Sequence, residues 1–275
     1  MTVLIIGGSG FLGTELLRQA TSAGFSTAAT FNSRPGEALG TAWHHLDLRD
    51  PLRLDDVLDA VQPSTVINSS SGNSNWSVTA DGPGLLAQRT ARRGIRFVHV
   101  SSDAVFSGDR GSSYDETAPP DPVTPYGAAK GAAETAVRLL HPAAVVARTS
   151  LIIGDGGSAH ERVVHELAAG TRSGALFTDD VRCPVHVADL AAALLELMTS
   201  HEAGIAHVAG SEALTRYELG VLIARRDGID PSLLPAGRRA DTRFLGALDV
   251  RLDCRATQRR LVTRLRSARE FLVQG

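Results

Sequence analysis

Two side chains in one short stretch of the sequence have the types and the spacing needed to give a proton to a carbonyl oxygen. Tyr126 and Lys130 lie four residues apart after Pro125, so a helix that begins near the proline would place both on one face. A free phenol has a pKa of about 10, and a neighbouring ammonium group favours the phenolate and brings that pKa toward neutrality. Of the 28 basic residues only Lys130 is a lysine, which indicates a position where a compact, tunable ammonium group is required.

Ser102 is the third candidate for this chemistry. It directly follows residues 96–101, a run typical of a buried strand. In a doubly wound sheet the carboxyl ends of the strands line the ligand crevice. We therefore predict that Ser102 orients a substrate oxygen, Tyr126 donates the proton, and Lys130 acts on both the phenol and the ribose of a nicotinamide cofactor.

A glycine-rich stretch near the start of the chain predicts a dinucleotide site. Three of its glycines, Gly7, Gly10 and Gly13, are spaced three residues apart, between an apolar run at residues 3–6 and a helical pattern that extends to about residue 23. The first glycine allows a tight turn, the second lets the backbone approach a pyrophosphate, and the third allows close packing of helix and strand. The predicted cofactor contacts in this loop are Gly7, Ser9, Gly10, Phe11, Leu12 and Gly13.

The end of the second predicted strand, residues 26–31, bears on the choice of cofactor. An NAD site places a carboxylate there for the ribose 2′-hydroxyl, but this chain has no acid between Glu15 and Glu37. A hydroxyl and a guanidinium suit a 2′-phosphate, so we predict NADPH rather than NADH. Asp47 is a candidate partner for the adenine amino group, although an ordinary loop aspartate is an equally open interpretation. The further predicted cofactor contacts are Asn32, Ser33, Arg34, Asp47, Leu48, Asn68, Ser69, Ser70 and Lys130.

The elements that must position these side chains follow from the hydrophobic pattern. Short apolar runs alternate with helical periodicity up to about residue 150, which predicts βαβ units and an α/β fold with a doubly wound parallel sheet (Rossmann). The expected strands are residues 3–6, 26–31, 43–46, 65–68, 96–101 and 143–148, and the expected helices are 12–23, 52–61, 84–93 and 126–139.

The alternation weakens beyond Ser150, and we predict a smaller C-terminal substrate lobe there. Helical patterns at 188–198 and 214–226 flank a short apolar run at 206–209. We therefore divide the chain into an NAD(P)-binding Rossmann domain at 1–150 and a mainly substrate-binding lobe at 151–275, with some segments that return to the Rossmann core. The last 40 residues carry an excess of arginine, which either reflects solvated helix faces or attracts an anionic, diphosphate-bearing substrate.

Composition excludes several classes of function. The 275 residues carry a formal net charge of −2, which argues against general nucleic-acid binding. No apolar run approaches the length of a membrane span, and the N-terminus has no signal-peptide pattern. Two cysteines, Cys183 and Cys254, predict reduced thiols in a cytoplasmic protein rather than a disulfide framework. No Cys/His cluster has metal spacing, so we expect no metal.

These motifs together resemble the dTDP-4-dehydrorhamnose reductase branch of the extended short-chain dehydrogenase/reductase superfamily. The resemblance covers residues 1 to about 225 and rests on the glycine loop at 7–13, the strand end at 100–106, the catalytic-helix motif at 125–130, the sixth-strand end at 147–150, and the segment 183–190. It implies reduction of a 4-keto group on a nucleotide-linked deoxysugar by NAD(P)H. The predicted substrate contacts are Ser71, Asp103, Ala104 and Arg182.

Departures from the family pattern leave the substrate open. Ala104 stands where the family has a tyrosine, and residues 72–76 are unusually polar. The main expectation is an NADPH-dependent reductase of a ketone on a sugar or sugar-like substrate. An epimerase or dehydratase of the same superfamily, and a non-catalytic NADP-binding regulatory subunit, are the alternatives. A homodimer is compatible with the resemblance.

Overall fold

A seven-stranded sheet forms the centre of the fold in the computed structural model, which describes residues 1–73, 75–243 and 246–273. The strand order is β11-β6-β5-β4-β1-β2-β3. Strand β1 pairs in parallel with β2 and β4, β2 with β3, and β4 with β5. This order confirms the predicted doubly wound fold. The strands are β1 (Thr2–Ile6), β2 (Ser26–Phe31), β3 (Ala42–His45), β4 (Thr65–Asn68), β5 (Arg96–Ser102), β6 (Val145–Thr149) and β11 (Gly204–His207).

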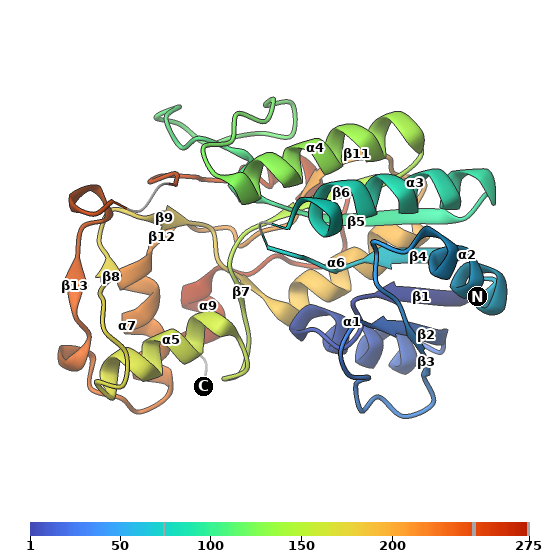
Figure 1. Ribbon diagram of the computed structural model, residues 1–275. Helices are drawn as coiled ribbons and strands as arrows, with labels where there is room; N and C mark the ends of the chain where they lie inside the picture. The colour runs from blue at the N-terminus through green and yellow to red at the C-terminus, as the bar shows by residue number, and fades with distance from the viewer. Residues whose placement is uncertain (74, 244–245, 274–275) are drawn as a thin grey trace. The chain divides into compact units, whose positions relative to one another are not determined.

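Helices cover both faces of this sheet because its strands are apolar on both faces. Val3, Leu4, Ile5 and Ile6 of β1 point alternately to the two sides, and all four are buried. Figure 1 shows α3 and α4 over one face and α1 and α6 over the other. The helices are α1 (Phe11–Ser22), α2 (Pro51–Val61), α3 (Gly82–Arg92), α4 (Pro125–Leu140) and α6 (Val187–Thr199), and a short π-helix (Ser77–Asp81) leads into α3.

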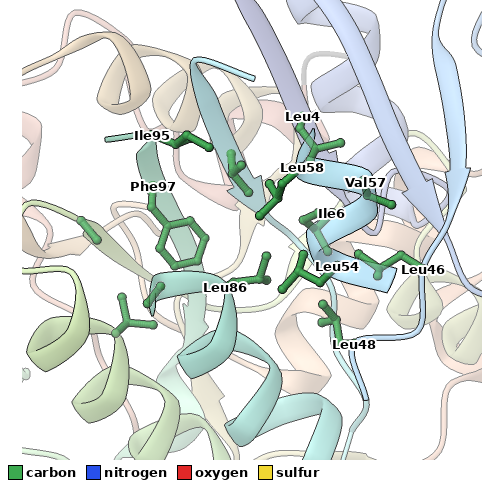
Figure 2. Close-up of a cluster of buried hydrophobic side chains, with 14 of the residues drawn as sticks. Leu4, Ile6, Leu46, Leu48, Leu54, Val57, Leu58, Leu86, Ile95 and Phe97 are labelled. Carbon is green, nitrogen blue, oxygen red and sulfur yellow. The ribbon is translucent and has the colours of Figure 1, made fainter. Parts of the chain in front are cut away.

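One hydrophobic cluster fixes α2, α3 and α4 on the sheet. Figure 2 shows Leu4 and Ile6 of β1 and Phe97 of β5 facing Leu54 of α2 and Leu86 of α3. All five side chains are buried. Burial of a side chain of this size stabilises the fold by about 1.5–3 kcal/mol. The carboxyl ends of the strands are thereby held at one edge, where the loops after them carry the predicted site residues.

The chain divides into two compact units that are not continuous in sequence. The first unit holds residues 1–102, 125–148 and 191–206, and the second holds 103–124, 149–190 and 207–275. The segment 103–124 therefore belongs to the second unit, whereas the sequence-based division placed it before the boundary at residue 150. The run expected at 206–209 overlaps strand β11, which begins and ends two residues earlier and joins the central sheet next to β6.

The second unit has its own core and only short strands. Its largest helices, α5 and α7, pack through Val164, Leu167, Leu219 and Ile223, and α9 adds Leu272. The elements of this unit that lie outside the central sheet are β7 (Ile152–Ile153), α5 (Ala159–Ala168), β8 (Leu176–Phe177), β9 (Val181–Arg182), β10 (Val185–His186), β12 (Leu214–Thr215), α7 (Arg216–Arg226), β13 (Ala236–Gly237), α8 (Arg255–Gln258) and α9 (Ala268–Val273). Among the described residues, no helix has both the length and the apolar character to cross a bilayer.

Candidate active site

The glycine loop between β1 and α1 is fixed to the end of β2. Gly7 has φ +79°, a conformation that favours glycine. Its N–H donates to the Thr30 hydroxyl at 3.1 Å, and the N–H of Gly8 donates to the Thr30 carbonyl at 2.9 Å. Helix α1 then begins after Gly10, which provides no side-chain cap. The first N–H groups of α1 and the positive end of its dipole therefore remain suited to an anion.

Gly13 permits the close approach of α1 to this loop. A Cβ atom at this position would lie 2.3 Å from the Gly7 carbonyl oxygen and 2.7 Å from the Gly8 Cα. At Gly10 the nearest atom would be the Gly7 oxygen at 3.3 Å. The third glycine of the motif is thus required for packing, whereas a methyl group at the second would only have to move the Gly7 carbonyl by a few tenths of an ångström.

We expect Gly13→Ala to weaken both the fold and dinucleotide binding. The added methyl must displace loop backbone, and such overpacking costs about 1–3 kcal/mol. We predict a lower thermal unfolding midpoint and a Kd for NADPH raised about tenfold, which corresponds to about 1.4 kcal/mol. Thermal unfolding and NADPH fluorescence titration measure the two effects. Gly10→Ala is the matched control, since it should weaken binding with little change in the unfolding midpoint; equal loss of stability in both variants would contradict this assignment.

A cavity of about 550 Å³ lies over the glycine loop within the first unit. The predicted residues that line it are Gly7, Ser9, Gly10, Asn32, Asp47, Leu48, Ser69, Ser70 and Ser71. Ser71, which we predicted as a substrate contact, therefore lies among the predicted cofactor contacts. Lining residues that the sequence reasoning missed are Ile6, Thr30, Phe31, Leu46, Arg49, Gly72, Asn75 and Val78. Several follow from one signal, because Ile6, Phe31 and Leu46 lie at or just beyond the carboxyl ends of strands.

Seven predicted cofactor residues do not line this cavity: Phe11, Leu12, Gly13, Ser33, Arg34, Asn68 and Lys130. Asn68 is fully buried and supports the cavity wall from behind. Its Nδ2 lies 3.1 Å from His99 Nδ1, and its Oδ1 accepts the N–H and the hydroxyl of Ser70 at 3.1 and 2.6 Å. Ser69 in turn donates to the Ile6 carbonyl at 2.9 Å. The polar residues after β4 thus hold this loop in place against β1 and β5.

The carboxylate of Asp47 is occupied by a neighbouring arginine. Arg49 Nε lies 3.0 Å from both carboxylate oxygens, and the Arg49 N–H donates to Oδ1 at 2.9 Å. These hydrogen bonds lower the pKa of Asp47 to about 2, so the group stays ionised at neutral pH. Arg49 therefore brings a cation to the cavity that the sequence reasoning did not assign.

Arg34 lies in the loop after β2 and is exposed. Within the described part of the chain it makes no hydrogen bond or ion pair, in contrast to Arg49. Asn32 of the same loop lines the cavity, and Ser33 is exposed beside it. The loop thus carries a free guanidinium two residues from the cavity wall.

The three predicted catalytic residues all belong to the first unit. Ser102 ends β5, and Tyr126 and Lys130 lie in the first turns of α4. Lys130 is 3% exposed, and its Nζ donates to the Val100 carbonyl at 2.9 Å. This hydrogen bond connects the helix to β5 two residues before Ser102. Tyr126 is half-buried, one helical turn before Lys130 on the same face.

Burial changes the proton affinity of Lys130. Desolvation lowers its pKa to about 8, and the nearby carboxylate of Glu134 acts in the opposite direction. The group therefore remains largely protonated at neutral pH but titrates far below a free lysine. An ammonium group of this kind favours the phenolate form of a nearby tyrosine.

The other predicted substrate residues belong to the second unit. Asp103 and Ala104 lie in a single 3₁₀ turn (Asp103–Val105), where the Asp103 carboxylate accepts the Ser150 hydroxyl at 2.6 Å. Arg182 is buried, with Nη1 2.8 Å from Asp180 and Nε 3.7 Å from Asp103. Its nitrogens also donate to the backbone carbonyls of β9 and of residues 247–248. The guanidinium of Arg182 is thus already engaged by this unit's own groups.

A second cavity, of about 430 Å³, lies inside the second unit and was not predicted. Asp180 meets two more arginines at its wall, Arg239 at 2.5 Å and Arg216 at 3.7 Å. His160 also lines this cavity, and burial, followed by the charge of Arg216, lowers its pKa to about 4. The arginines outnumber the acid, so the wall is cationic. The sequence signal that could have indicated this cationic cavity is the excess of arginine in the last 40 residues, which include Arg239.

A doubly wound sheet with this glycine loop and a Tyr/Lys pair on α4 defines a dinucleotide-binding protein of the α/β class. The chain belongs to the RmlD substrate binding domain family, whose model matches residues 1–274. It is 32% identical to a dTDP-4-dehydrorhamnose reductase of Mycobacterium tuberculosis, over 83% of this chain and 76% of that protein. It is 30% identical to the probable low-salt glycan biosynthesis reductase Agl14 of Haloferax volcanii, over 88% and 85% of the two chains.

The fold also matches a solved structure. A hypothetical dTDP-4-dehydrorhamnose reductase from Sulfolobus tokodaii superposes with a TM-score of 0.82 at 26% identity, over 97% of each chain. These similarities confirm the predicted resemblance and the fold class.

Proposed function

We propose that this chain is an NADPH-dependent reductase of a keto group on a nucleotide-linked deoxysugar. The observation that carries the proposal is Lys130, the single lysine, which is buried on α4 one turn from Tyr126 and bonded to β5 just before Ser102. The relatives named as reductases support the reaction class. A binding module alone has no need for a buried ammonium group beside a phenol.

The first unit fits a dinucleotide. The close contact at Gly13, the uncapped start of α1 and the 550 Å³ cavity form a cradle for a pyrophosphate and its attached riboses. Gly7, Gly10, Ser9 and the polar residues after β4 would hold the cofactor. When bound, NADPH supplies the hydride that reduces the carbonyl carbon.

The residues of this chain supply the proton and the orientation. Negative charge develops on the substrate oxygen as its carbon is reduced, so a donor near that oxygen lowers the barrier. Tyr126 Oη gives its proton to this oxygen, and Ser102 Oγ donates a hydrogen bond that orients it. The Lys130 ammonium group stabilises the phenolate that Tyr126 leaves behind.

The cationic cavity of the second unit supports an anionic substrate. Arg216 and Arg239 line it, and a diphosphate of a nucleotide sugar is the anion that the named relatives suggest. We propose that the second unit takes the nucleotide part of the substrate and that the first unit takes the cofactor.

Absorbance of NADPH at saturating 4-keto sugar tests this function. We propose a panel of dTDP- and UDP-linked 4-keto-6-deoxysugars, with ketones that lack a nucleotide as the control. Net oxidation of NADPH with the nucleotide sugars is the expected result. Conversion of the sugar without net NADPH oxidation would indicate an epimerase or dehydratase, and turnover of only the simple ketones would overturn the substrate class.

We expect Arg34→Ala to reduce the preference for NADPH over NADH. Loss of one charge-assisted hydrogen bond costs about 1.5–3 kcal/mol, so kcat/KM for NADPH should fall at least about tenfold while that for NADH changes little. Steady-state kinetics with both cofactors measure the ratio. Arg49→Ala is the informative comparison, because Arg49 lines the cavity but is paired with Asp47. If kcat/KM for NADPH fell selectively in Arg49→Ala and not in Arg34→Ala, the contact with the 2′-phosphate would be assigned to Arg49 instead.

A further inference from the structure

The carboxylate of Glu134 is buried behind the proposed catalytic residues. Glu134 lies on α4, one turn after Lys130, and is 2% exposed. It accepts the Ser101 hydroxyl at 2.6 Å. Arg148 of β6, which is 1% exposed, donates to it from Nη2 at 2.8 Å and from Nε at 3.0 Å. One carboxylate therefore connects α4 with two neighbouring strands of the sheet.

Such an ionic cluster is a costly way to pack a helix on a sheet. Each buried charge loses several kcal/mol of hydration, and apolar residues of similar volume often stabilise a fold as well or better. Here the cluster holds two cations, Lys130 and Arg148, and one anion, Glu134. The apolar cluster under α2, α3 and α4 already fixes the helices. Packing alone therefore does not explain the three buried charges of this cluster.

The contacts of this cluster converge on the strand residues just before Ser102. Lys130 Nζ donates to the Val100 carbonyl, and the next residue along the strand, Ser101, donates to Glu134. Two successive residues of β5 are therefore bonded to two successive turns of the same face of α4. This double connection sets the register between the strand that ends in Ser102 and the helix that begins with Tyr126.

The charges that face Lys130 come from few groups. On α4 the acid that acts on its pKa is Glu134. On β5 the facing group is His99, which is fully buried, and burial together with the charge of Lys130 holds its pKa well below the ordinary value. His99 is therefore neutral at pH 7. On β6 Arg148 is paired with Glu134. Tyr126, which is also titratable, lies one turn earlier on α4.

We propose that Glu134 is a positioning residue for the reductase: it fixes α4 on β5 through Ser101 and on β6 through Arg148, and its negative charge stabilises the ammonium group of Lys130. This inference rests on the proposed function. Glu134 itself does not contact the reacting atoms in this assignment; it acts through Lys130 and through the register of the helix.

The single lysine makes a direct test possible. Protein grown with lysine labelled with ¹³C at Cε gives one lysine resonance, and its shift with pH reports the protonation of Lys130 without any need for activity. In Glu134→Gln the amide still reaches Ser101 but the charge is gone, so we expect the titration midpoint to fall by about one pH unit from its wild-type value. The alkaline limb of the kcat/KM profile should move down by the same amount. We expect kcat to fall about tenfold at pH 8, with a KM for NADPH within about threefold of wild type.

Two further variants separate the effect of the Glu134 charge from the effect of the register between α4 and β5. Ser101→Ala keeps the carboxylate charge and removes the bond to β5, so kcat should fall while the Lys130 midpoint stays where it is. Arg148→Met removes the cation that neutralises Glu134, so the midpoint should rise. Unfolding would instead drive the midpoint of any variant up to the value of a free lysine, and circular dichroism identifies that case.

The outcomes separate this inference from the proposed function. An unchanged midpoint in folded Glu134→Gln would overturn the electrostatic role, and wild-type turnover in Ser101→Ala would overturn the role in register. The Lys130 titration midpoint can shift as expected in Glu134→Gln even if the wild-type protein reduces no nucleotide sugar. That result would contradict the proposed function and still support the electrostatic coupling between Glu134 and Lys130.

Discussion

Tyr126→Phe should lower kcat about 10³-fold and leave the Kd for NADPH within about twofold of wild type. The change removes one oxygen atom, and with it the proton donor that the substrate oxygen requires; general acid catalysis by a positioned group is worth about 10²–10⁴ in rate. The half-buried position of Tyr126 at the start of α4 leaves the glycine loop and its cavity untouched. Single-turnover NADPH oxidation and a fluorescence titration measure the two quantities.

Tyr217→Phe is the matched control for this experiment. Tyr217 is one of the three tyrosines of the chain and lies on α7 in the second unit, partly buried against that unit's core. Loss of its hydroxyl should leave turnover within about twofold of wild type, as is usual for a substitution away from a site. If Tyr126→Phe retained turnover, Tyr126 would have no part in proton transfer, and the phenol-based mechanism would have to be abandoned.

The first unit could be predicted from the sequence because the patterns that indicate its strands and helices each lie within a short stretch of the chain. The run at residues 3–6, the glycine loop and the helix after it adjoin one another, and each strand or helix follows from the periodicity within its own short segment. Parallel strands with right-handed crossovers then leave few possible arrangements, so the doubly wound fold class also followed. Asn32, Asp47, Ser69 and Ser70, predicted just after strand ends, line the cavity for the same reason.

The second unit could not be predicted in this way because it is assembled from distant segments. Its strands outside the central sheet have two residues each, too short to show a period, and β9 pairs with β12 across more than 30 residues. Arg182 illustrates the consequence. It was predicted as a substrate contact, but it ends β9 and its guanidinium is paired with Asp180, two residues earlier. The carboxylate of Asp103, from a distant part of the chain, lies 3.7 Å from its Nε.

The environment of Lys130 shows the same contrast between local sequence signals and contacts that form only in the folded chain. Its type and its spacing from Tyr126 were sufficient to predict a functional lysine. The acceptor at Val100, the carboxylate at Glu134 and the depth of burial all depend on contacts with β5 and β6, which spacing along one helix does not reveal. The sequence was therefore sufficient to predict Lys130 as a functional residue, but it did not reveal the proton affinity of its side chain.

Lys130→Met should lower kcat at least about 10²-fold and yet not lower the thermal unfolding midpoint at pH 7. The methionine side chain fills a similar volume but removes the charge that favours the phenolate of Tyr126, so the proton donor loses its electrostatic support. It also removes a buried ammonium group that costs the native state free energy, which offsets the lost hydrogen bond to Val100. Stopped-flow kinetics and calorimetry measure the two effects. Lys130→Arg keeps a cation but replaces the compact group by a larger guanidinium that does not titrate, so it should be as inactive as the methionine variant.

The pH dependence of stability provides an independent check on the same residue. The pKa of Lys130 is about 8 in the native state and 10.5 as the reference value for the unfolded chain. Between these values the unfolded state binds more protons, so Lys130 makes the free energy of unfolding rise with pH over this window. The buried thiol of Cys183 acts in the opposite direction, since burial raises its pKa to about 11. The comparison must therefore be the difference between wild type and Lys130→Met, in which the contribution of the thiol cancels. We expect that difference to grow in favour of the wild type from pH 8 to pH 10.5; a flat difference would mean that Lys130 titrates as a free lysine and that its burial does not tune it for proton transfer.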